Sequence, residues 1–427
     1  MNSITIMQVF KFGGASVNSV ERIRNVGDIL KVYPNEKILV VISAMGKTTN
    51  ALEKVTEAFF EGRKEEALQL FDAIKQNHIQ TAKYLLVTHF GDTLARLTDF
   101  FTEVEWLLYD KPVRPFDYYY DQIVCIGELL STTIVSGWLN EAGFTNTWID
   151  VRDIIRTDDN FRDANIDWDL TQRAVREKIA PLFADVDLVL TQGFIGSTDE
   201  NESTTLGREG SDYTAAIFAN MLDAESQSIW KDVIGVMNAD PKHFPDAQLI
   251  PELNYTEVIE MAYYGAQVIH PKTIKPLQNK QIPLLVKCFM EPGLPGTRIA
   301  KQSAKNLPPI IVIKEKQVMM QLKSKDFSFV EGKPLRQVYQ YFEELNIKPN
   351  LTQNGAITFL CALDDRADKI EKLAHASGEI FDVQLMKGLT LLTIRHFNPD
   401  ILRKLTNGRT ILLRQQTPET VQVLMIG

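Results

Sequence analysis

The segment KFGGASV, residues 11–17, has the residue types of a phosphate-binding loop. It follows a predicted strand and precedes a helical pattern. Adjacent Gly13 and Gly14 let backbone N–H groups approach a phosphate closely, the following helix N-terminus adds a favourable dipole, and Lys11 supplies a point charge. We therefore predict a phosphate site here, with Ser16 beside it. An ordinary strand–helix connection is the alternative.

A second cluster of polar groups, SAMGKTTN at residues 43–50, ends an apolar strand. Its Gly-Lys-Thr resembles the end of a Walker A loop, but that loop needs a glycine five residues earlier, where position 41 is valine. A P-loop nucleotidase is therefore disfavoured. What remains is a set of hydroxyl and amide groups, which includes Ser43 and Thr49, at the carboxyl end of a strand, where open α/β sheets bind ligands.

The stretch TTLGREGSDYT, residues 204–214, is the most informative one and follows the turn QGFIG at residues 192–196. Its glycines permit a tight turn. Arg208 can bind a carboxylate through two hydrogen bonds, and Asp212 lies where it could organise Mg²⁺ or a cationic group at a helix start. The alternative is an ordinary helix N-terminus capped by Ser211 or Asp212.

A fourth polar segment, KDVIGVMNADP at residues 231–241, follows an apolar strand. Asp232 and Asp240 either line a nucleotide pocket or shape a turn. Phosphoryl transfer needs positioning and neutralisation of charge, which glycines, lysines, Mg²⁺ and carboxylate-binding groups supply. The sequence has no HExxH or GxSxG motif, so a hydrolase would lack a metal or a nucleophile, and no residue is predicted to hold a metal of its own.

The first half of the chain must position these segments on a mainly parallel sheet. Short β-branched runs alternate with longer helical patterns, and several runs are apolar throughout, as in strands covered on both faces. We predict strands at residues 8–12, 38–43, 145–150, 188–193, 226–231 and 282–287. Apolar spacing between residues 51 and 108 predicts two long helices. The fold class is α/β, a mostly parallel central sheet sandwiched by helices.

A cluster of prolines and glycines at residues 290–309 predicts a domain boundary. The later elements are shorter. We predict a strand at 310–323, a helix at 335–345, strands at 357–363 and 379–386, and then only short strands to residue 426. This pattern indicates a small α+β sandwich of one or two related copies.

The 427-residue chain has the ordinary balance of a globular protein with two or more domains, 44% hydrophobic and 24% charged residues. Its net charge of −9 disfavours nucleic acid and anionic membranes as partners. The three cysteines form no CxxC pair, so neither a disulfide framework nor a zinc site is indicated. There is no signal-peptide pattern, which predicts a cytoplasmic protein. Met7 is an alternative start to Met1.

In this order and spacing, the four segments resemble the aspartokinases, a family with the amino-acid-kinase fold. KFGGASV is similar to the family's opening signature and GFIG…TTLGREGSDYTAA to its central one. The resemblance implies a catalytic domain at residues 7–295 and tandem ACT-like regulatory modules at residues 310–427, the second shortened. It implies transfer of the γ-phosphoryl group of Mg²⁺-ATP to the side-chain carboxylate of L-aspartate, which begins lysine, threonine and methionine biosynthesis.

The resemblance also assigns roles to single residues. Lys11 and Asp212 would be catalytic. Lys11, Gly13, Gly14, Ser16, Lys231, Asp232 and Lys242 would bind ATP or its phosphates, and Ser43, Thr49, Glu128, Arg208 and Ser211 would bind aspartate. Glu128 would meet the ammonium group and Arg208 the α-carboxylate. Because the attacking carboxylate is already ionised at pH 7, no general base is required.

The chain departs from the family pattern near the nucleotide. Lys231, Met237 and Gln267 stand where the family usually has threonine, tyrosine and lysine, and Lys231 could restore the charge lost at Gln267. Residues 324–332 replace the usual effector loop, so lysine feedback, threonine feedback and insensitivity all stay open. Edge-to-edge pairing of ACT modules implies a homodimer. The alternative functions are a kinase of glutamate, acetylglutamate or UMP, and a catalytically weak amino-acid-binding protein.

Overall fold

The computed structural model describes residues 6–302 and 306–426, which form two compact units. The first contains the chain to Val236 together with residues 249–259 and the segment from Val268 to residue 302. The second contains residues 237–248, 260–267 and 306–426. Two short segments that the sequence placed in the catalytic domain therefore belong to the second unit. The question of a start at Met1 or Met7 concerns residues 1–5, which lie outside the described residues.

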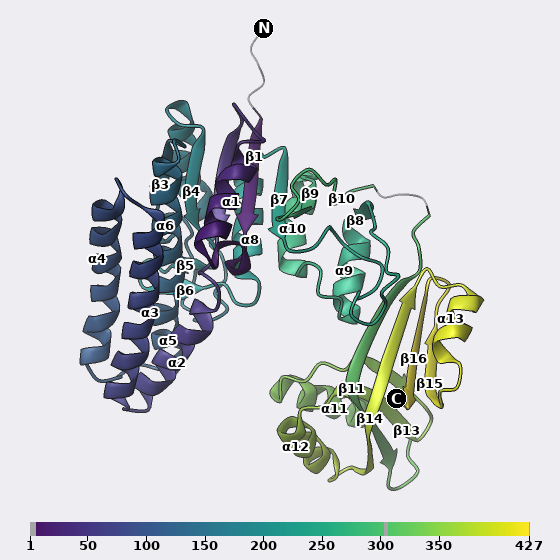
Figure 1. Ribbon diagram of the computed structural model, residues 1–427. Coiled ribbons are helices and arrows are strands. Elements are labelled where there is room, and N and C mark those ends of the chain that lie inside the picture. Colours follow the sequence, from purple (N-terminus) through teal and green to yellow (C-terminus); the bar gives the residue numbers. More distant parts are fainter. Residues whose placement is uncertain (1–5, 303–305, 427) are drawn as a thin grey trace. The chain divides into compact units, whose positions relative to one another are not determined.

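The first unit is built on a sheet whose strand order is β3-β4-β2-β1-β7-β9-β10-β8 (Figure 1). Neighbouring strands are parallel except for β9 and β10. The strands are β1 (Met7–Phe12), β2 (Lys37–Ile42), β3 (Asn146–Ile149), β4 (Leu188–Gln192), β7 (Ser226–Lys231), β8 (Glu252–Asn254), β9 (Leu284–Cys288) and β10 (Thr297–Ala300). The predicted fold class is confirmed, and a strand lies at each of the six predicted places.

The central strands bring the motif segments to one edge of the sheet. β1 lies between β2 and β7, with Phe12 opposite Ile42 and Trp230. Because the strands are parallel, their carboxyl ends lie side by side. Lys11, the loop after Ile42 and Lys231 therefore reach the same edge. A short hairpin of β5 (Ile195–Ser197) and β6 (Ser203–Thr205) follows β4 there.

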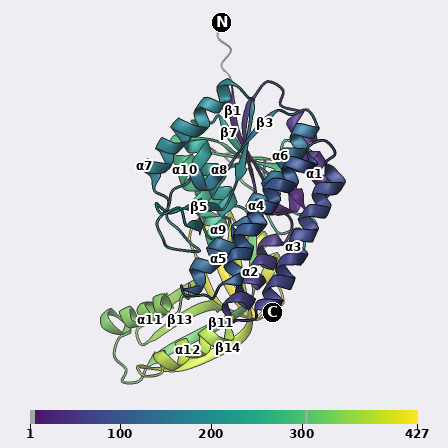
Figure 2. The same ribbon diagram turned by 90° about the vertical axis from the view of Figure 1, so that its left-hand side faces the viewer.

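Helices cover both faces of this sheet, with α8 and α10 on one side and α1 and α6 on the other (Figure 2). Their bounds are α1 (Val20–Leu30), α5 (Phe116–Val124), α6 (Ile126–Glu141), α7 (Trp168–Ala174), α8 (Gly210–Met221), α9 (Tyr255–Tyr264) and α10 (Pro271–Lys280). Strand residues such as Val9, Val40 and Leu190 are fully buried. The sheet is thus enclosed on both faces, as its apolar strands predicted.

Residues 48–109 form three helices, so the prediction of two was wrong. They are α2 (Thr48–Phe60), α3 (Lys64–Leu85) and α4 (Phe90–Tyr109). Gly62 turns the chain after α2 with φ of 77°, a conformation that glycine adopts without strain. Before α4, the Glu141 carboxylate accepts backbone N–H bonds from Thr88 and His89. The apolar spacing continues across both turns, so it does not reveal where one helix ends and the next begins.

Helices α5 and α6 together form an apolar stretch, residues 116–141, long and apolar enough by composition to span a membrane. The most apolar part of this stretch is 89% buried inside the protein. Its apolar side chains therefore meet protein, as those of a core helix do. The stretch also carries two buried carboxylates, Asp121 and Glu128. Glu128 lines the cavity described below, and Asp121 accepts hydrogen bonds from two residues that line it.

The second unit is an antiparallel sheet in the order β12-β13-β11-β14-β16-β15. Its elements are β11 (Ile310–Ser324), α11 (Gly332–Glu344), β12 (Leu351–Asn354), β13 (Thr358–Asp364), α12 (Ala367–Ser377), β14 (Phe381–Arg395), α13 (Pro399–Thr406), β15 (Ile411–Gln416) and β16 (Thr420–Ile426). The long strands β11 and β14 pair along their length, with a register shift around Lys316.

The register shift divides this sheet into two halves that share their central strands. Helices α11 and α12 supply Phe342 and Leu373 to a core with Phe359 on one side. Helix α13 supplies Leu402 to a core with Leu392 on the other. Such α+β halves agree with ACT modules, and the ACT-like fold class is confirmed. The strand predicted at 379–386 is part of the longer β14, which has 15 residues, and the prediction of further short strands beyond it missed α13.

Candidate active site

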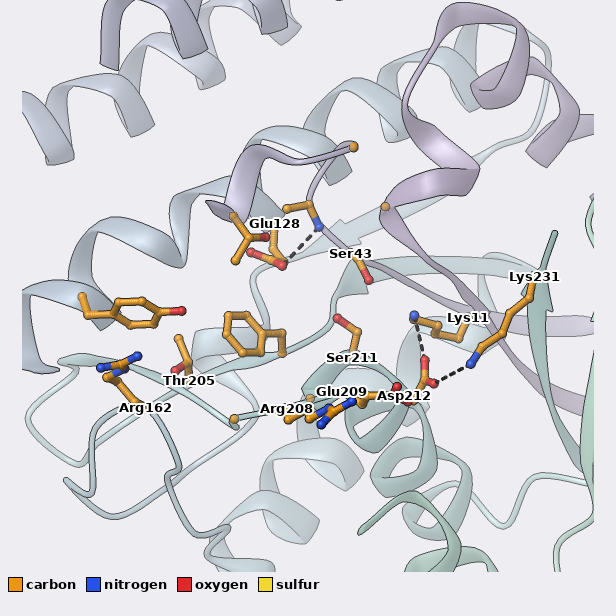
Figure 3. A pocket seen from close by; sticks show the side chains of 18 residues that line it. Lys11, Ser43, Glu128, Arg162, Thr205, Arg208, Glu209, Ser211, Asp212 and Lys231 are labelled. Atoms are coloured by element: carbon orange, nitrogen blue, oxygen red, sulfur yellow. Dashed lines mark hydrogen bonds and ion pairs between the residues drawn. The ribbon is translucent and has the colours of Figure 1, made fainter. Parts of the chain in front are cut away.

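A cavity of about 540 Å³ lies at the carboxyl edge of the sheet in the first unit. This volume is ordinary for a small-molecule site. It is lined by Lys11, Gly14, Ser43, Ala44, Gly46, Thr49, Tyr120, Glu128, Arg162, Phe194, Thr205, Gly207, Arg208, Glu209, Gly210, Ser211, Asp212 and Lys231 (Figure 3). The four motif segments therefore meet around one space.

One end of the cavity is formed by a carboxylate between two lysines. The Asp212 side chain, in the first turn of α8 and 2% exposed, has its Oδ1 atom 2.7 Å from Lys11 Nζ and its Oδ2 atom 3.6 Å from Lys231 Nζ. Burial opposes the ionisation of Asp212, but the two lysines outweigh it and hold its pKa below the ordinary value. Asp212 and the two lysines together carry one net positive charge, and burial raises the pKa of the neighbouring Glu209, which favours its neutral form. Positive charge is what a phosphate site requires.

The glycine at position 14 is required by the packing of two loops. A Cβ atom there would lie 2.5 Å from the carbonyl oxygen of Ala44 and 3.0 Å from that of Gly46. The backbone N–H of Gly46 also donates to the Gly14 carbonyl, at 3.0 Å. A side chain at position 14 would push apart the loops after β1 and β2, which both line the cavity.

The residues predicted to bind aspartate, Ser43, Thr49, Glu128, Arg208 and Ser211, all line the cavity. Ser211 can approach the end of β4 because Gly193 has no side chain, and a Cβ atom there would lie 2.5 Å from the Ser211 Cβ. Arg208 is exposed, and no ion pair of its guanidinium is found within residues 6–302 and 306–426. It is free to bind an anion.

Glu128 is as deeply buried in the cavity wall as Asp212. Its side chain is in the first turn of α6 and only 2% exposed. The Oε1 atom accepts a hydrogen bond of 3.2 Å from the backbone N–H of Ala44, while no described residue donates to Oε2. Burial raises the pKa of Glu128 to about 8, although the Ala44 N–H and the charge of Lys11 oppose this. Within residues 6–302 and 306–426 the side chain forms no ion pair with a lysine, arginine or histidine.

Some predicted residues do not line this cavity, as far as the described residues show. Gly13 and Ser16 are not among the lining residues, and the Ser16 hydroxyl is directed at the Trp230 carbonyl at 3.5 Å. Asp232 instead forms an ion pair with Arg22. Lys242 belongs to the second unit, like Met237 and Gln267. The assignment of these residues to ATP stays a prediction.

Other lining residues were not predicted. Thr205, Phe194 and Glu209 lie inside motifs that the sequence had singled out, so proximity to those motifs was the available signal. Tyr120 and Arg162 come from segments without any motif. Only the fold brings α5 and the turn at residues 157–166 to the cavity wall.

Comparison with known proteins identifies the family. Residues 7–288 match the model of the amino acid kinase family. The chain belongs to this family. Within it, this amino acid kinase is 32% identical over 409 residues to the chloroplastic aspartokinase 1 of Arabidopsis thaliana, which covers 90% of the chain and 70% of that relative. It is also 32% identical to the lysine-sensitive aspartokinase 3 of Escherichia coli K12, over 83% of the chain and 78% of that relative.

Solved structures of aspartokinases are also similar to this chain. Escherichia coli aspartokinase III, in complex with lysine and aspartate in its T-state, matches this amino acid kinase with a TM-score of 0.81 and 27% identity, over 99% of this chain and 96% of that one. Its R-state complex with aspartate and ADP matches with a TM-score of 0.80 and the same identity and coverage. The resemblance to aspartokinases seen in the motifs is therefore confirmed.

Proposed function

We propose that this amino acid kinase phosphorylates the side-chain carboxylate of L-aspartate with ATP, forming ADP and 4-phospho-L-aspartate. One observation carries the proposal. The same cavity holds two lysines for phosphates, Lys11 and Lys231, and a buried carboxylate for an ammonium group, Glu128, which forms no ion pair with any residue that the structure describes. The relatives named aspartokinases and the aspartate and ADP complexes of Escherichia coli aspartokinase III support it.

In this proposal the protein acts mainly through position and charge. Glu128 binds the substrate ammonium group and Arg208 the α-carboxylate, so the side-chain carboxylate is directed toward the phosphate end. Lys11 neutralises the charge that develops on the transferred phosphoryl group. Lys231, held 3.1 Å from the Val268 carbonyl oxygen and close to Asp212, supplies the charge that the family usually has at position 267.

Mg²⁺ would accompany ATP and neutralise its phosphates. Mg²⁺ bound with a nucleotide is usually held by one or two carboxylates together with the phosphates and water. Asp212 and the neighbouring Glu209 are the carboxylates at the phosphate end that could complete its coordination.

The proposed activity is tested by measuring ADP release from Mg²⁺-ATP with four acceptors: L-aspartate, L-glutamate, acetylglutamate and UMP. We expect turnover with L-aspartate alone. Turnover with another acceptor instead would assign a different substrate. Binding of aspartate without any ADP release would identify the catalytically weak binding protein that the substitutions at Met237 and Gln267 leave as the alternative.

The affinity for aspartate should increase with pH. Because burial raises the Glu128 pKa to about 8, the side chain is mostly neutral at pH 7 and must lose its proton to pair with the ammonium group. We expect the KM for aspartate to fall by up to about tenfold per pH unit between pH 6 and 8 and then to level off. The KM for ATP, measured in the same series, is the internal control. A flat profile for aspartate would contradict the proposed role of Glu128.

The ACT-like unit is proposed to bind an amino-acid effector and to pair in a homodimer. Lysine is the effector that the similar Escherichia coli enzyme contains, and threonine is the other candidate. We expect lysine, but not alanine, to inhibit ADP release and raise the melting temperature, and light scattering to report the mass of two chains. Absence of both effects with lysine and with threonine would indicate an unregulated enzyme.

We also infer a reducing, cytoplasmic environment, in which the three buried, unpaired cysteines stay reduced.

A further inference from the structure

A buried carboxylate that none of the motifs includes bonds to two residues of the cavity wall. Asp121, in α5, is fully buried. It accepts three hydrogen bonds, from the backbone N–H of Arg162 at 3.0 Å, from the backbone N–H of Thr205 at 2.8 Å and from the Thr205 hydroxyl at 2.7 Å. Arg162 and Thr205 both line the cavity. One side chain thus fixes two separate pieces of the wall.

The turn that carries Arg162 is strained and firmly held. Arg162 has φ of 69°, a left-handed conformation that is unfavourable for a residue with a side chain. The turn is closed by a bridge between Thr157 and Ile166 and by the Asp158 carboxylate, which accepts the backbone N–H of Asn165 at 2.8 Å. A strained conformation kept by several contacts is a common sign of a functional position.

The guanidinium of Arg162 is oriented by its neighbours but not fully used by them. It lies 4.3 Å from the centre of the Tyr120 ring, and its Nη1 atom lies 3.1 Å from the Asp117 carboxylate. A guanidinium has five N–H donors, so these contacts leave donors available. Figure 3 shows Arg162 and Thr205 at one end of the group of side chains, with Lys11 and Lys231 at the opposite end. Arg162 therefore lies away from the phosphate end.

We propose that Arg162 binds the α-carboxylate of the amino-acid substrate, together with Arg208, and that Asp121 is the positioning residue that holds Arg162 for this purpose. The inference rests on the proposed function and adds a specificity determinant to it. A carboxylate can accept hydrogen bonds from two guanidinium groups at once, and two such partners select an α-amino acid over an amine or a monocarboxylate.

The first test is Arg162→Ala, which removes the guanidinium but keeps the backbone N–H that Asp121 accepts. We expect the KM for aspartate to rise about tenfold, as for the loss of one charge-assisted hydrogen bond, with an unchanged KM for ATP. β-Alanine, which is aspartate without its α-carboxylate, should inhibit the wild type and the variant equally. The proposal would be overturned if Arg162→Ala weakened the binding of aspartate and β-alanine equally, or if it left the KM for aspartate unchanged.

The second test is Asp121→Asn, which keeps the shape but turns an N–H group toward one of the donors. It should raise the KM for aspartate at least as much as Arg162→Ala and again leave the KM for ATP unchanged. If this variant does not fold, Thr205→Val, which removes one of the three hydrogen bonds, should still raise the KM for aspartate, whereas Thr205→Ser should not. An unchanged KM in Thr205→Val and in any folded Asp121→Asn would overturn the positioning role.

A matched control separates this role from general loosening of the turn. Lys272 forms an ion pair with Asp163 in the same turn but does not line the cavity. Lys272→Ala should leave both KM values unchanged, and an equal rise in the KM for aspartate would contradict the inference. Failure of the proposed function itself is recognised differently, because the wild type would then release no ADP with aspartate.

Discussion

Replacing Lys11 with alanine should lower kcat about a thousandfold and change the KM for aspartate little. Lys11 is 8% exposed and is the lysine that lies closest to Asp212 at the phosphate end. A preorganised charge beside the transferred group stabilises the transition state more than the bound substrates, and loss of one such group typically costs 10²–10³ in kcat, roughly 3–4 kcal/mol. Steady-state ADP release with saturating ATP and aspartate measures the effect.

The Lys11→Ala result needs a check on folding, because the change also removes a partner of the buried Asp212. Lys231, 3.6 Å away, still pairs with that carboxylate, so we expect a folded protein with a lower melting temperature. Lys54→Ala, at an exposed position on α2, is the matched control and should keep wild-type kcat. A folded Lys11→Ala variant with near-normal kcat would rule out Lys11 as a catalytic residue.

Replacing Glu128 with glutamine should raise the KM for aspartate about a hundredfold, with a smaller effect on kcat. The change keeps the shape and an acceptor for the Ala44 N–H but removes the charge that pairs with the substrate ammonium group, and hydrogen bonds to charged groups contribute about 1.5–3 kcal/mol. The KM for aspartate should also lose its dependence on pH between 6 and 8. A pH-dependent KM in the variant would show that another group titrates.

Although Glu128→Gln should weaken aspartate binding, we expect it to increase the stability of the folded protein at high pH. Burial raises the folded-state pKa of Glu128 to about 8, above the usual value near 4.5. The stability associated with the neutral side chain is therefore complete below about pH 4.5 and is lost as the pH rises through 8. Glutamine never ionises, so Glu128→Gln should be more stable than the wild type at pH 8–9, by up to about 5 kcal/mol. Urea unfolding at pH 5 and pH 9 measures the difference.

The sequence predicted the central strands and much of the cavity because both depend on local patterns. Apolar runs such as residues 38–42 indicate strands covered on both faces, and parallel pairing then brings their carboxyl ends together. Lys11 lies at the carboxyl end of β1, and Ser43 and Arg208 lie in segments that follow strands. Their meeting around one cavity follows from the sheet order, with β1 between β2 and β7.

The remaining features depend on contacts between distant segments. Arg162 and Tyr120 reach the cavity only through the packing of α5 against β6 and the hydrogen bonds of Asp121, which no local pattern encodes. The eight-residue helix α13 is too short for apolar spacing to reveal it, although Asn398 caps it by accepting the Ile401 backbone N–H at 2.9 Å. Met237 and Gln267 looked like altered nucleotide contacts, and the structure places them in the second unit.

The second unit contains segments from two separate parts of the sequence, which limits where the chain can be truncated. Ala239 and Phe244, which come from the middle of the sequence, belong to the same apolar core as Ile311 and Leu392. A truncated protein that ends near residue 300 would contain those side chains but lack the strands that bury them. The exposed apolar surface would favour aggregation. The ACT-like unit therefore cannot be removed or exchanged as a separate domain. A variant of the protein without feedback inhibition is better made by point substitution than by deleting this unit.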